Sequence, residues 1–270
     1  GALPDMVAIT QDGLTAVVAN EGEPNSDYSI DPEGSITVVD ISNTASPVAS
    51  QVSFSAFNEG EARAAELPED VRVFGNFGRT ELTVSAFSDS DPATITVNDT
   101  SGISVGNWFT LASSEGDPLA YQVDAIAGNV LTLTDEFDGD SEVGDAGVAG
   151  LTVYLHDGQS SVAQDLEPEY IAISPDGEKA WVTLQENNAI AVIDIASAGV
   201  DKIIALGVKD HNIPGNELDA SDRDDGINIR SWPVKGMYMP DSIASFEVGG
   251  NSYYITANEG DSREYDAFVE

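Results

Sequence analysis

The chain has 270 residues, of which 48 are acidic and 10 are basic, for a formal net charge of −38. A field of this sign repels the phosphates of nucleic acids and anionic membranes, so nucleic acid is excluded as a partner. The chain has no cysteine, which excludes disulfides and thiolate metal sites, and no apolar run approaches the roughly 20 residues that span a bilayer.

One sequence pattern occurs three times, beginning at Pro4, Pro168 and Pro240. Each copy starts with proline and an acidic residue, runs through an apolar strand and a tight glycine turn, and reaches a second strand that ends in an amide residue followed by Glu. The first two copies add a third strand that ends at Ile41 and Ile195. Repeats of a short antiparallel sheet are typical of β-propellers, so the sequence predicts an all-β fold with about two and a half propeller blades.

Both ends of the chain fall inside a copy of this pattern. The chain begins at Gly1 without an initiator Met, and the third copy stops after its second strand. Because a propeller typically closes with about 4 to 8 blades, we expect the remaining blades to come from a missing part of the chain or from another chain.

The spacing of the copies predicts an inserted domain, because the first two copies lie much farther apart than the last two. Between them, threonine and aliphatic residues alternate in six short predicted strands, 82–84, 94–97, 108–111, 121–123, 130–133 and 151–154. The predicted core of this segment consists of Val84, Ile95, Trp108, Phe109, Leu111, Val123, Leu131 and Leu133. We therefore expect propeller blades in residues 1–78 and 159–270, and a small β-barrel or sandwich in residues 79–158.

The repeated motifs place six acidic residues on one face. In a blade the strands run outward from the central channel, so the residues before the first strand and after the second meet near that channel. The predicted acid pairs are Asp5 with Glu21, Glu169 with Glu186 and Asp241 with Glu259, with the adjacent amides Asn20, Gln185 and Asn258. Carboxylates this close repel one another unless a cation lies among them. They are either solvated strand caps or ligands of a hard cation, for which calcium is the expected cofactor.

A long segment on the same face, residues 207–236, concentrates positive charge. It contains four of the ten basic residues, including Lys209, and one of the two histidines, His211. These side chains either hold an anionic ligand or pair with aspartates of their own segment. The opposite face carries only short turns at Asp12 and Asp176, so we expect any ligand on the acid-bearing face.

Several strings of residues agree in order with a known family. They are DLEPEYIAISPDG at 165–177, AWVTLQENNA at 180–189, KDH at 209–211, GMYMPD at 236–241 and TANEGDSREY at 256–265. Over residues 3–77 and 159–270 the chain resembles the bacterial extracellular propellers called choice-of-anchor I, and more loosely the YVTN-repeat proteins. The resemblance implies a secreted or surface-attached bacterial protein, extracellular, at the cell surface or periplasmic, often with a C-terminal anchor. Some members are labelled alkaline phosphatase-like.

Two functions fit this sequence. The first is a binding or adhesion scaffold that holds calcium on its loop face and recognises a surface or a small anionic ligand. The alternative is a calcium-dependent phosphoesterase, in which the channel carboxylates hold metal ions that polarise phosphoryl oxygens, with Arg63 or Arg263 as a phosphate clamp. No catalytic residue is assigned, because two histidines are too few for a binuclear metallophosphatase and no nucleophile elbow or Walker loop occurs.

Overall fold

The structure is a computed structural model, and it describes residues 1–25, 30–74, 80–88, 92–111, 119–134, 152–155, 160–221, 223–224, 226–265 and 268–269. By its contacts the chain divides into two compact units. The first consists of Gly1–Gly22, Glu33–Val73 and Val162–Asp261, and the second of Glu23–Pro32, Phe74–Ser161 and Ser262–Glu270.

The first unit contains two four-stranded antiparallel sheets in which each strand pairs with the next along the chain. The first sheet consists of β1 (Pro4–Ile9), β2 (Thr15–Asn20), β3 (Ser35–Asp40) and β4 (Val48–Ser53). The second consists of β11 (Pro168–Ile173), β12 (Lys179–Leu184), β13 (Ala189–Asp194) and β14 (Gly199–Ala205). This meander is the form of a propeller blade, so the predicted all-β propeller architecture is confirmed.

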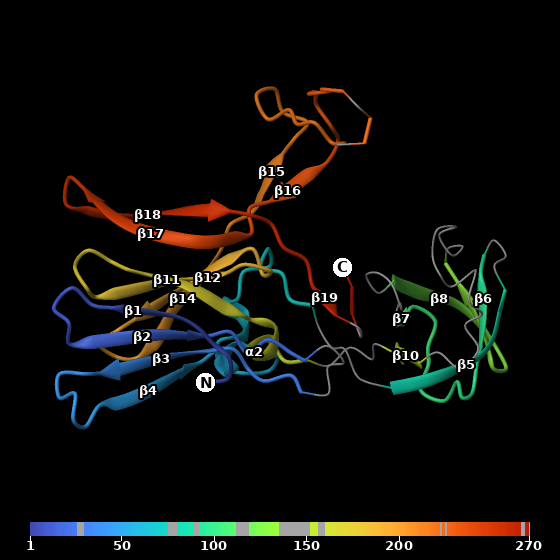
Figure 1. Cartoon of the computed structure of the whole chain (residues 1–270), viewed down its shortest axis with the longest axis horizontal. Helices are drawn as coiled ribbons and strands as arrows, with labels where there is room; N and C mark the ends of the chain where they lie inside the picture. The colour runs from blue at the N-terminus through green and yellow to red at the C-terminus, as the bar shows by residue number, and fades with distance from the viewer. Residues whose placement is uncertain are drawn as a thin grey trace. The chain divides into compact units, whose positions relative to one another are not determined.

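The third copy forms a two-stranded hairpin of β17 (Pro240–Val248) and β18 (Asn251–Asn258). The first strands of the three copies lie next to one another, since β1 packs against β11 and β11 packs against β17. Figure 1 shows the two sheets and this hairpin side by side, in blue, yellow and red. The structure therefore contains two complete blades and half of a third, as the repeats predict.

The second blade is buried on both faces because it lies between the other two. One face contributes Val182 and Ala191 to a core that includes Val17 and Ile36 of the first blade. The other face packs Ile190 against Ile243 of the hairpin. This position explains why β13 reads Ala-Ile-Ala-Val-Ile-Asp and not as an alternation of apolar and polar residues, since both sides of the strand are shielded from water.

The second unit contains a closed six-stranded barrel in the order β10-β5-β6-β9-β8-β7. Its strands are β5 (Thr80–Ser88), β6 (Thr94–Val97), β7 (Trp108–Leu111), β8 (Leu119–Ala127), β9 (Val130–Leu133) and β10 (Thr152–Leu155). These match the six predicted strands. Of the predicted core, Val84, Ile95, Val123, Leu131 and Leu133 are buried. The side chains of Trp108, Phe109 and Leu111 lie outside the described residues, as do the predicted boundaries at 79 and 158.

The remaining elements are short. In the first unit they are the 3-10 turns η1 (Ser55–Phe57) and η2 (Ala64–Glu66), the helix α2 (Val162–Asp165), and the strands β15 (Val208–Asp210) and β16 (Lys235–Met237). In the second unit they are β19 (Glu264–Tyr265) and β20 (Phe268–Val269). β15 and β16 form a ribbon that extends beyond the β17–β18 hairpin (Figure 1). Among the described residues, no helix has the length and apolar character to cross a membrane.

Candidate functional site

The first strand of each repeat is irregular at the same position. The pairing register shifts between Pro4 and Met6 in β1, between Pro168 and Ile171 in β11, and between Pro240 and Ser242 in β17. The acidic residue that follows each proline lies inside this irregularity, namely Asp5, Glu169 and Asp241. A bulged residue leaves the ladder and its side chain is re-aimed, so the repeat presents an acid at the same end of three adjacent strands.

Glu169 lies at the centre of the resulting group of acids. Its carboxyl forms a side-chain hydrogen bond with Glu186, the residue that follows β12 by two positions. Burial first, and then the negative charge of Glu186, raise the pKa of Glu169 far above that of an ordinary glutamate, with further contributions from Glu21 and Asp5. Glu169 therefore keeps its proton to a higher pH than an ordinary glutamate does.

The group extends to the first and third repeats. Burial first, and then the charge of Asp241, raise the pKa of Asp5. The structure thus brings together five of the six predicted acids, Asp5, Glu21, Glu169, Glu186 and Asp241, which we call the carboxylate cluster. The sixth, Glu259, is exposed, and no interaction described by the structure joins it to the cluster.

The side chains of the carboxylate cluster are near one another without converging on a point. Within the described ranges, no three acidic or histidine side chains stand in an arrangement that could hold a metal ion directly. The pKa values of Asp5 and Glu169 are raised first by burial and then by the negative charge of the neighbouring acids.

The backbone at Glu186 is held in place by its neighbour Asn187, a residue to which the sequence analysis assigned no role. The side chain of Asn187 is fully buried, and its Nδ2 donates to the carbonyl oxygens of Arg72 (2.9 Å) and Asp165 (2.7 Å). The guanidinium of Arg72 donates in turn to the carbonyl oxygen of Glu186, at 3.1 Å. Asn187 therefore joins the end of β12 to two segments that are distant in sequence, and it fixes the backbone that carries Glu186.

Asn188 makes the next connection, from blade 2 to the third repeat. Its Nδ2 donates to the carbonyl oxygen of Gly207, and its Oδ1 accepts from the backbone N–H groups of Tyr238 and Met239. The residue has a left-handed φ of 51°, which asparagine tolerates better than most residues. The pair Asn187-Asn188 occurs only in the second copy, which is a sequence signal that the comparison of repeats did not use.

The three repeated amides are not equivalent. Asn20 is buried inside blade 1, where its Nδ2 donates to Ser35 and Thr37. Gln185 is buried, whereas Asn258 is exposed and accepts a hydrogen bond from Thr256. The contacts of Asn20 are those of a strand-stabilising residue, and its amide nitrogen is engaged within its own sheet.

The predicted basic residues have separate surroundings. The guanidinium of Arg63 contacts Glu66, donates to the carbonyl oxygens of Val200 and Asp201 on β14, and lies 4.5 Å from the centroid of the Phe57 ring. Because β14 is the last strand of its sheet and Glu169 lies on the first, Arg63 is placed away from the carboxylate cluster.

The other three basic candidates differ in their surroundings. Lys209 is exposed on β15. The Nδ1 of His211 is 2.6 Å from the carbonyl oxygen of Asn216, which belongs to the same segment, residues 207–236. Arg263 belongs to the second unit, where its guanidinium is buried over the ring of Phe74, 3.9 Å from the centroid.

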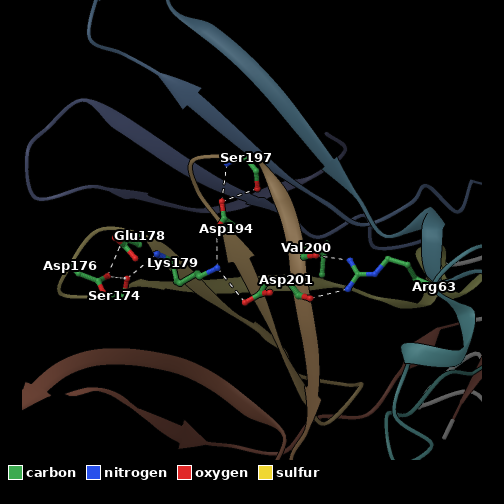
Figure 2. A network of polar contacts seen from close by, with 9 residues as sticks. All are labelled: Arg63, Ser174, Asp176, Glu178, Lys179, Asp194, Ser197, Val200 and Asp201. Carbon is green, nitrogen blue, oxygen red and sulfur yellow. Dashed lines mark hydrogen bonds and ion pairs between the residues drawn. The ribbon is translucent and has the colours of Figure 1, made fainter. Parts of the chain in front are cut away.

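The opposite end of the strands carries a second polar arrangement (Figure 2). Ser174 donates to Asp176, which also accepts from the backbone of Glu178 and has a lowered pKa, chiefly because of the Ser174 hydrogen bond. Lys179 forms ion pairs with Asp194 (2.8 Å) and Asp201 (3.3 Å). These bonds tie β12, β13 and β14 together at their ends.

The first blade repeats this turn, with Thr10 donating to Asp12. A hollow of about 400 Å³ lies between the two turns, lined by Thr10, Gln11, Asp12, Thr15, Pro175, Asp176, Gly177 and Ile195. The sequence interpretation expected little of chemical interest at this end. Both aspartates are nevertheless occupied as turn caps, so the hollow presents carboxylates that are already hydrogen bonded.

Comparison with known protein families assigns the chain to one of them. The sequence profile of the choice-of-anchor I domain matches residues 1–104 and 128–270. The chain belongs to the choice-of-anchor I domain family. The match extends farther into the barrel than the resemblance seen in the sequence, which ended at residue 77 and resumed at 159; only residues 105–127 are left out. Membership supports a bacterial cell-surface protein of the propeller type.

Comparison with solved structures and curated proteins adds little. The chain is similar to the periplasmic gluconolactonase PpgL of Pseudomonas aeruginosa, with 14% identity over 76% of this chain and 42% of that one, and a TM-score of 0.19. It is similar to the hydrazine synthase of Kuenenia stuttgartiensis, with 13% identity over 94% of this chain and 58% of that one, and a TM-score of 0.21. Likenesses this loose carry no argument about function. No curated protein matches the chain.

Proposed function

We propose that this choice-of-anchor I domain is an extracellular binding scaffold whose carboxylate cluster takes up a calcium ion. The observation that supports this most directly is the Glu169–Glu186 hydrogen bond, in which two carboxyl groups are pressed together beside Glu21 and Asp5. Such an arrangement is costly for the folded chain when all the acids are ionised. A proton relieves part of that cost, and a divalent cation relieves more of it.

The chemistry of the cluster suits calcium better than other divalent metals. Its donors are all carboxylate oxygens from three repeats, without histidine or thiolate, and oxygen donors are the ligands of calcium and magnesium. Calcium accepts six to eight oxygens in flexible geometry, so it tolerates side chains that first have to move inward. The excess of acidic residues over the whole chain also raises the local concentration of cations.

The phosphoesterase alternative has less support. The guanidinium of Arg63, one proposed phosphate clamp, is committed to β14 and Phe57. We therefore propose that the bound ion organises the loop face for an anionic or surface ligand, which would be recognised through the ion and not cleaved.

The test is thermal unfolding with calcium and with chelator at fixed ionic strength. A ligand that binds the folded state only stabilises it by about 2.7 kcal/mol at a hundredfold excess over its dissociation constant, so calcium should raise the melting temperature. The substitution Glu186→Gln should abolish this rise. The matched control is Glu259→Gln, which changes the same motif in the third repeat outside the cluster and should leave the rise intact. Equal effects of the two substitutions would contradict the proposal.

Calorimetry gives an independent check on mechanism. Because calcium would displace the proton that the raised pKa favours on Glu169, binding at neutral pH should release about one proton per ion. Titrations in two buffers with different ionisation enthalpies measure this number directly. Glu169→Gln removes the titrating group, and calcium that still binds to that variant should release no proton.

A further inference from the structure

The hollow between the first two blades lies at the end of the strands opposite the carboxylate cluster. It has a volume of about 400 Å³ and is lined by the turn that joins β1 to β2 and the turn that joins β11 to β12. Both blades that form it contain all four strands. Pockets for small ligands range from about 300 to about 1,000 Å³, so the hollow is large enough for a small molecule or a single side chain.

Each turn contributes one aspartate to the lining of the hollow, Asp12 in blade 1 and Asp176 in blade 2. Each carboxylate accepts one hydrogen bond from the hydroxyl two positions earlier and one from the backbone N–H two positions later. All four bonds end on Oδ1, and among the described residues no donor contacts the Oδ2 of either aspartate. Each carboxylate is therefore fixed in place with one oxygen left to accept from a ligand.

Both aspartates are ionised at neutral pH. The pKa of each is lowered, chiefly by the side-chain hydrogen bond from the preceding hydroxyl. The charge of Lys179 makes a small contribution at Asp176, but Lys179 forms its ion pairs with two other aspartates. No ion pair between described residues includes Asp12 or Asp176, so the hollow carries two negative charges that the surrounding chain does not neutralise.

The oxygen atoms of the hollow favour an organic cation over a metal ion. Two carboxylates supply at most four of the six to eight oxygens that calcium takes, and within the described ranges no three acidic or histidine side chains could hold a metal together. An ammonium group has three N–H donors, of which each Oδ2 can accept one. A guanidinium pairs best with both oxygens of one carboxylate, which the hydrogen bonds already made to Oδ1 hinder.

The remaining lining suits an aliphatic chain that carries such an ammonium group. Pro175 and Ile195 contribute apolar surface to the hollow, and Gln11 and Thr15 contribute polar side chains. A short unbranched chain can lie on the apolar surface while its charged end reaches the carboxylates, as the stems of lysine side chains do. The net charge of −38 attracts cations to the whole surface, so selectivity among them has to come from the hollow itself.

We propose that this hollow binds a primary ammonium group on a short aliphatic chain, held between Asp12 and Asp176. Two sources share this chemistry, the lysine side chain of a partner protein and a free aliphatic diamine. The third repeat has Gly249 and Gly250 at the corresponding turn and no carboxylate there, so the paired aspartates are specific to the first two blades. The site does not depend on calcium binding at the other end of the strands.

The experiment is an NMR titration of the isotope-labelled full chain with Nα-acetyl-lysine amide at neutral pH and fixed ionic strength. The amide signals of Gly13 and Gly177, which follow the two aspartates, should shift saturably. Asp12→Asn and Asp176→Asn should each raise the Kd by about tenfold, because each removes one charge-assisted hydrogen bond. The matched control is Asp99→Asn, which removes the same charge from a turn-capping aspartate in the second unit and should leave the Kd unchanged.

Three further probes test the chemistry of the ligand. Nα-acetyl-norleucine amide has the aliphatic chain without the charge and should give no saturable shift, and Nα-acetyl-arginine amide should bind more weakly than the lysine compound. Cadaverine separates the two sources: tighter binding of cadaverine than of the lysine amide identifies a free diamine, and weaker binding identifies a lysine side chain.

Asparagine can still cap these turns, so the variants should fold, and their spectra show whether they do. The two substitutions lie in different blades, so either one is sufficient if the other unfolds the chain. The proposal is overturned if the lysine amide gives no saturable shift at Gly13 and Gly177, or if the norleucine or arginine amide binds as tightly. It is also overturned if Asp99→Asn weakens binding as much as Asp12→Asn and Asp176→Asn do.

Discussion

Replacement of Glu169 by Gln should change how the stability of the calcium-free protein depends on pH. In the folded protein the pKa of Glu169 is raised, first by burial and then by the charge of Glu186, whereas in the unfolded chain it returns to the ordinary 4.5. Above that ordinary value the unfolded chain has lost the proton and the folded chain keeps it. Rising pH therefore favours the unfolded state, and the stability that the proton supports is lost progressively toward the raised pKa.

The size of the effect follows from the number of protons involved. One additional proton on the folded state lowers the free energy of unfolding by about 1.4 kcal/mol for each pH unit. Between about pH 5.5 and about pH 7.5 the loss is about 2.7 kcal/mol. Gln cannot titrate and keeps a hydrogen-bonding side chain of the same size, so the variant should lack this component and should be more stable than the parent at the higher pH.

Urea denaturation in the presence of chelator, at both pH values and at constant ionic strength, measures the difference. Other carboxylates also titrate in so acidic a chain, so the informative quantity is the pH slope of the parent minus the pH slope of the variant. Glu259→Gln is the control for a glutamate outside the cluster, and its slope should equal that of the parent. Identical slopes for the parent and Glu169→Gln would refute the reasoning, because they would mean that Glu169 holds no additional proton in the folded state.

Three further predictions concern the framework around the cluster. Asn188→Ala should lower the free energy of unfolding by about 4 kcal/mol in urea denaturation, since it removes three hydrogen bonds and places Ala at a left-handed φ, whereas Asn188→Gly should cost about 1 kcal/mol less. Arg63→Met should cost about 1–2 kcal/mol and leave calcium affinity unchanged by calorimetry, contrary to a role as phosphate clamp. A chain with Gly78 joined to Gln159 should retain a cooperative melting transition, because the described residues of the core shared by the two blades all lie outside the deleted segment.

The sequence determined the strands and turns of this protein because those features depend on neighbours in the chain. A Pro-acid start, an apolar run and an Asp-Gly turn specify the first two strands of a blade locally, and the same signals recur in each copy. The turn at Asp12 and the turn at Asp176 consequently have the same hydrogen bonds to the preceding hydroxyl and the following backbone. The alternation of threonine with aliphatic residues was sufficient in the same way for the six strands of the barrel.

The tertiary structure alone decided which of the repeated acids are buried together. Glu186 and Glu259 occupy the same position in the motif, yet Glu186 is 8% exposed and hydrogen bonded to Glu169, whereas Glu259 is exposed. The difference arises because blade 2 has a neighbour on each face, and the burial of a carboxyl group depends on those neighbours and not on its own strand.

The same reason explains why the sequence did not predict the contacts of Arg63 and Asn188, whose partners are distant in sequence. Arg63 contacts β14 more than a hundred positions away, and Asn188 fastens the segment that leads into β17. Comparison of the repeats relates each residue to its equivalents in the other copies. It therefore does not reveal contacts that a residue makes in one copy only. Such contacts form when the blades pack, and their energy comes from desolvated hydrogen bonds that exist only in the assembled fold.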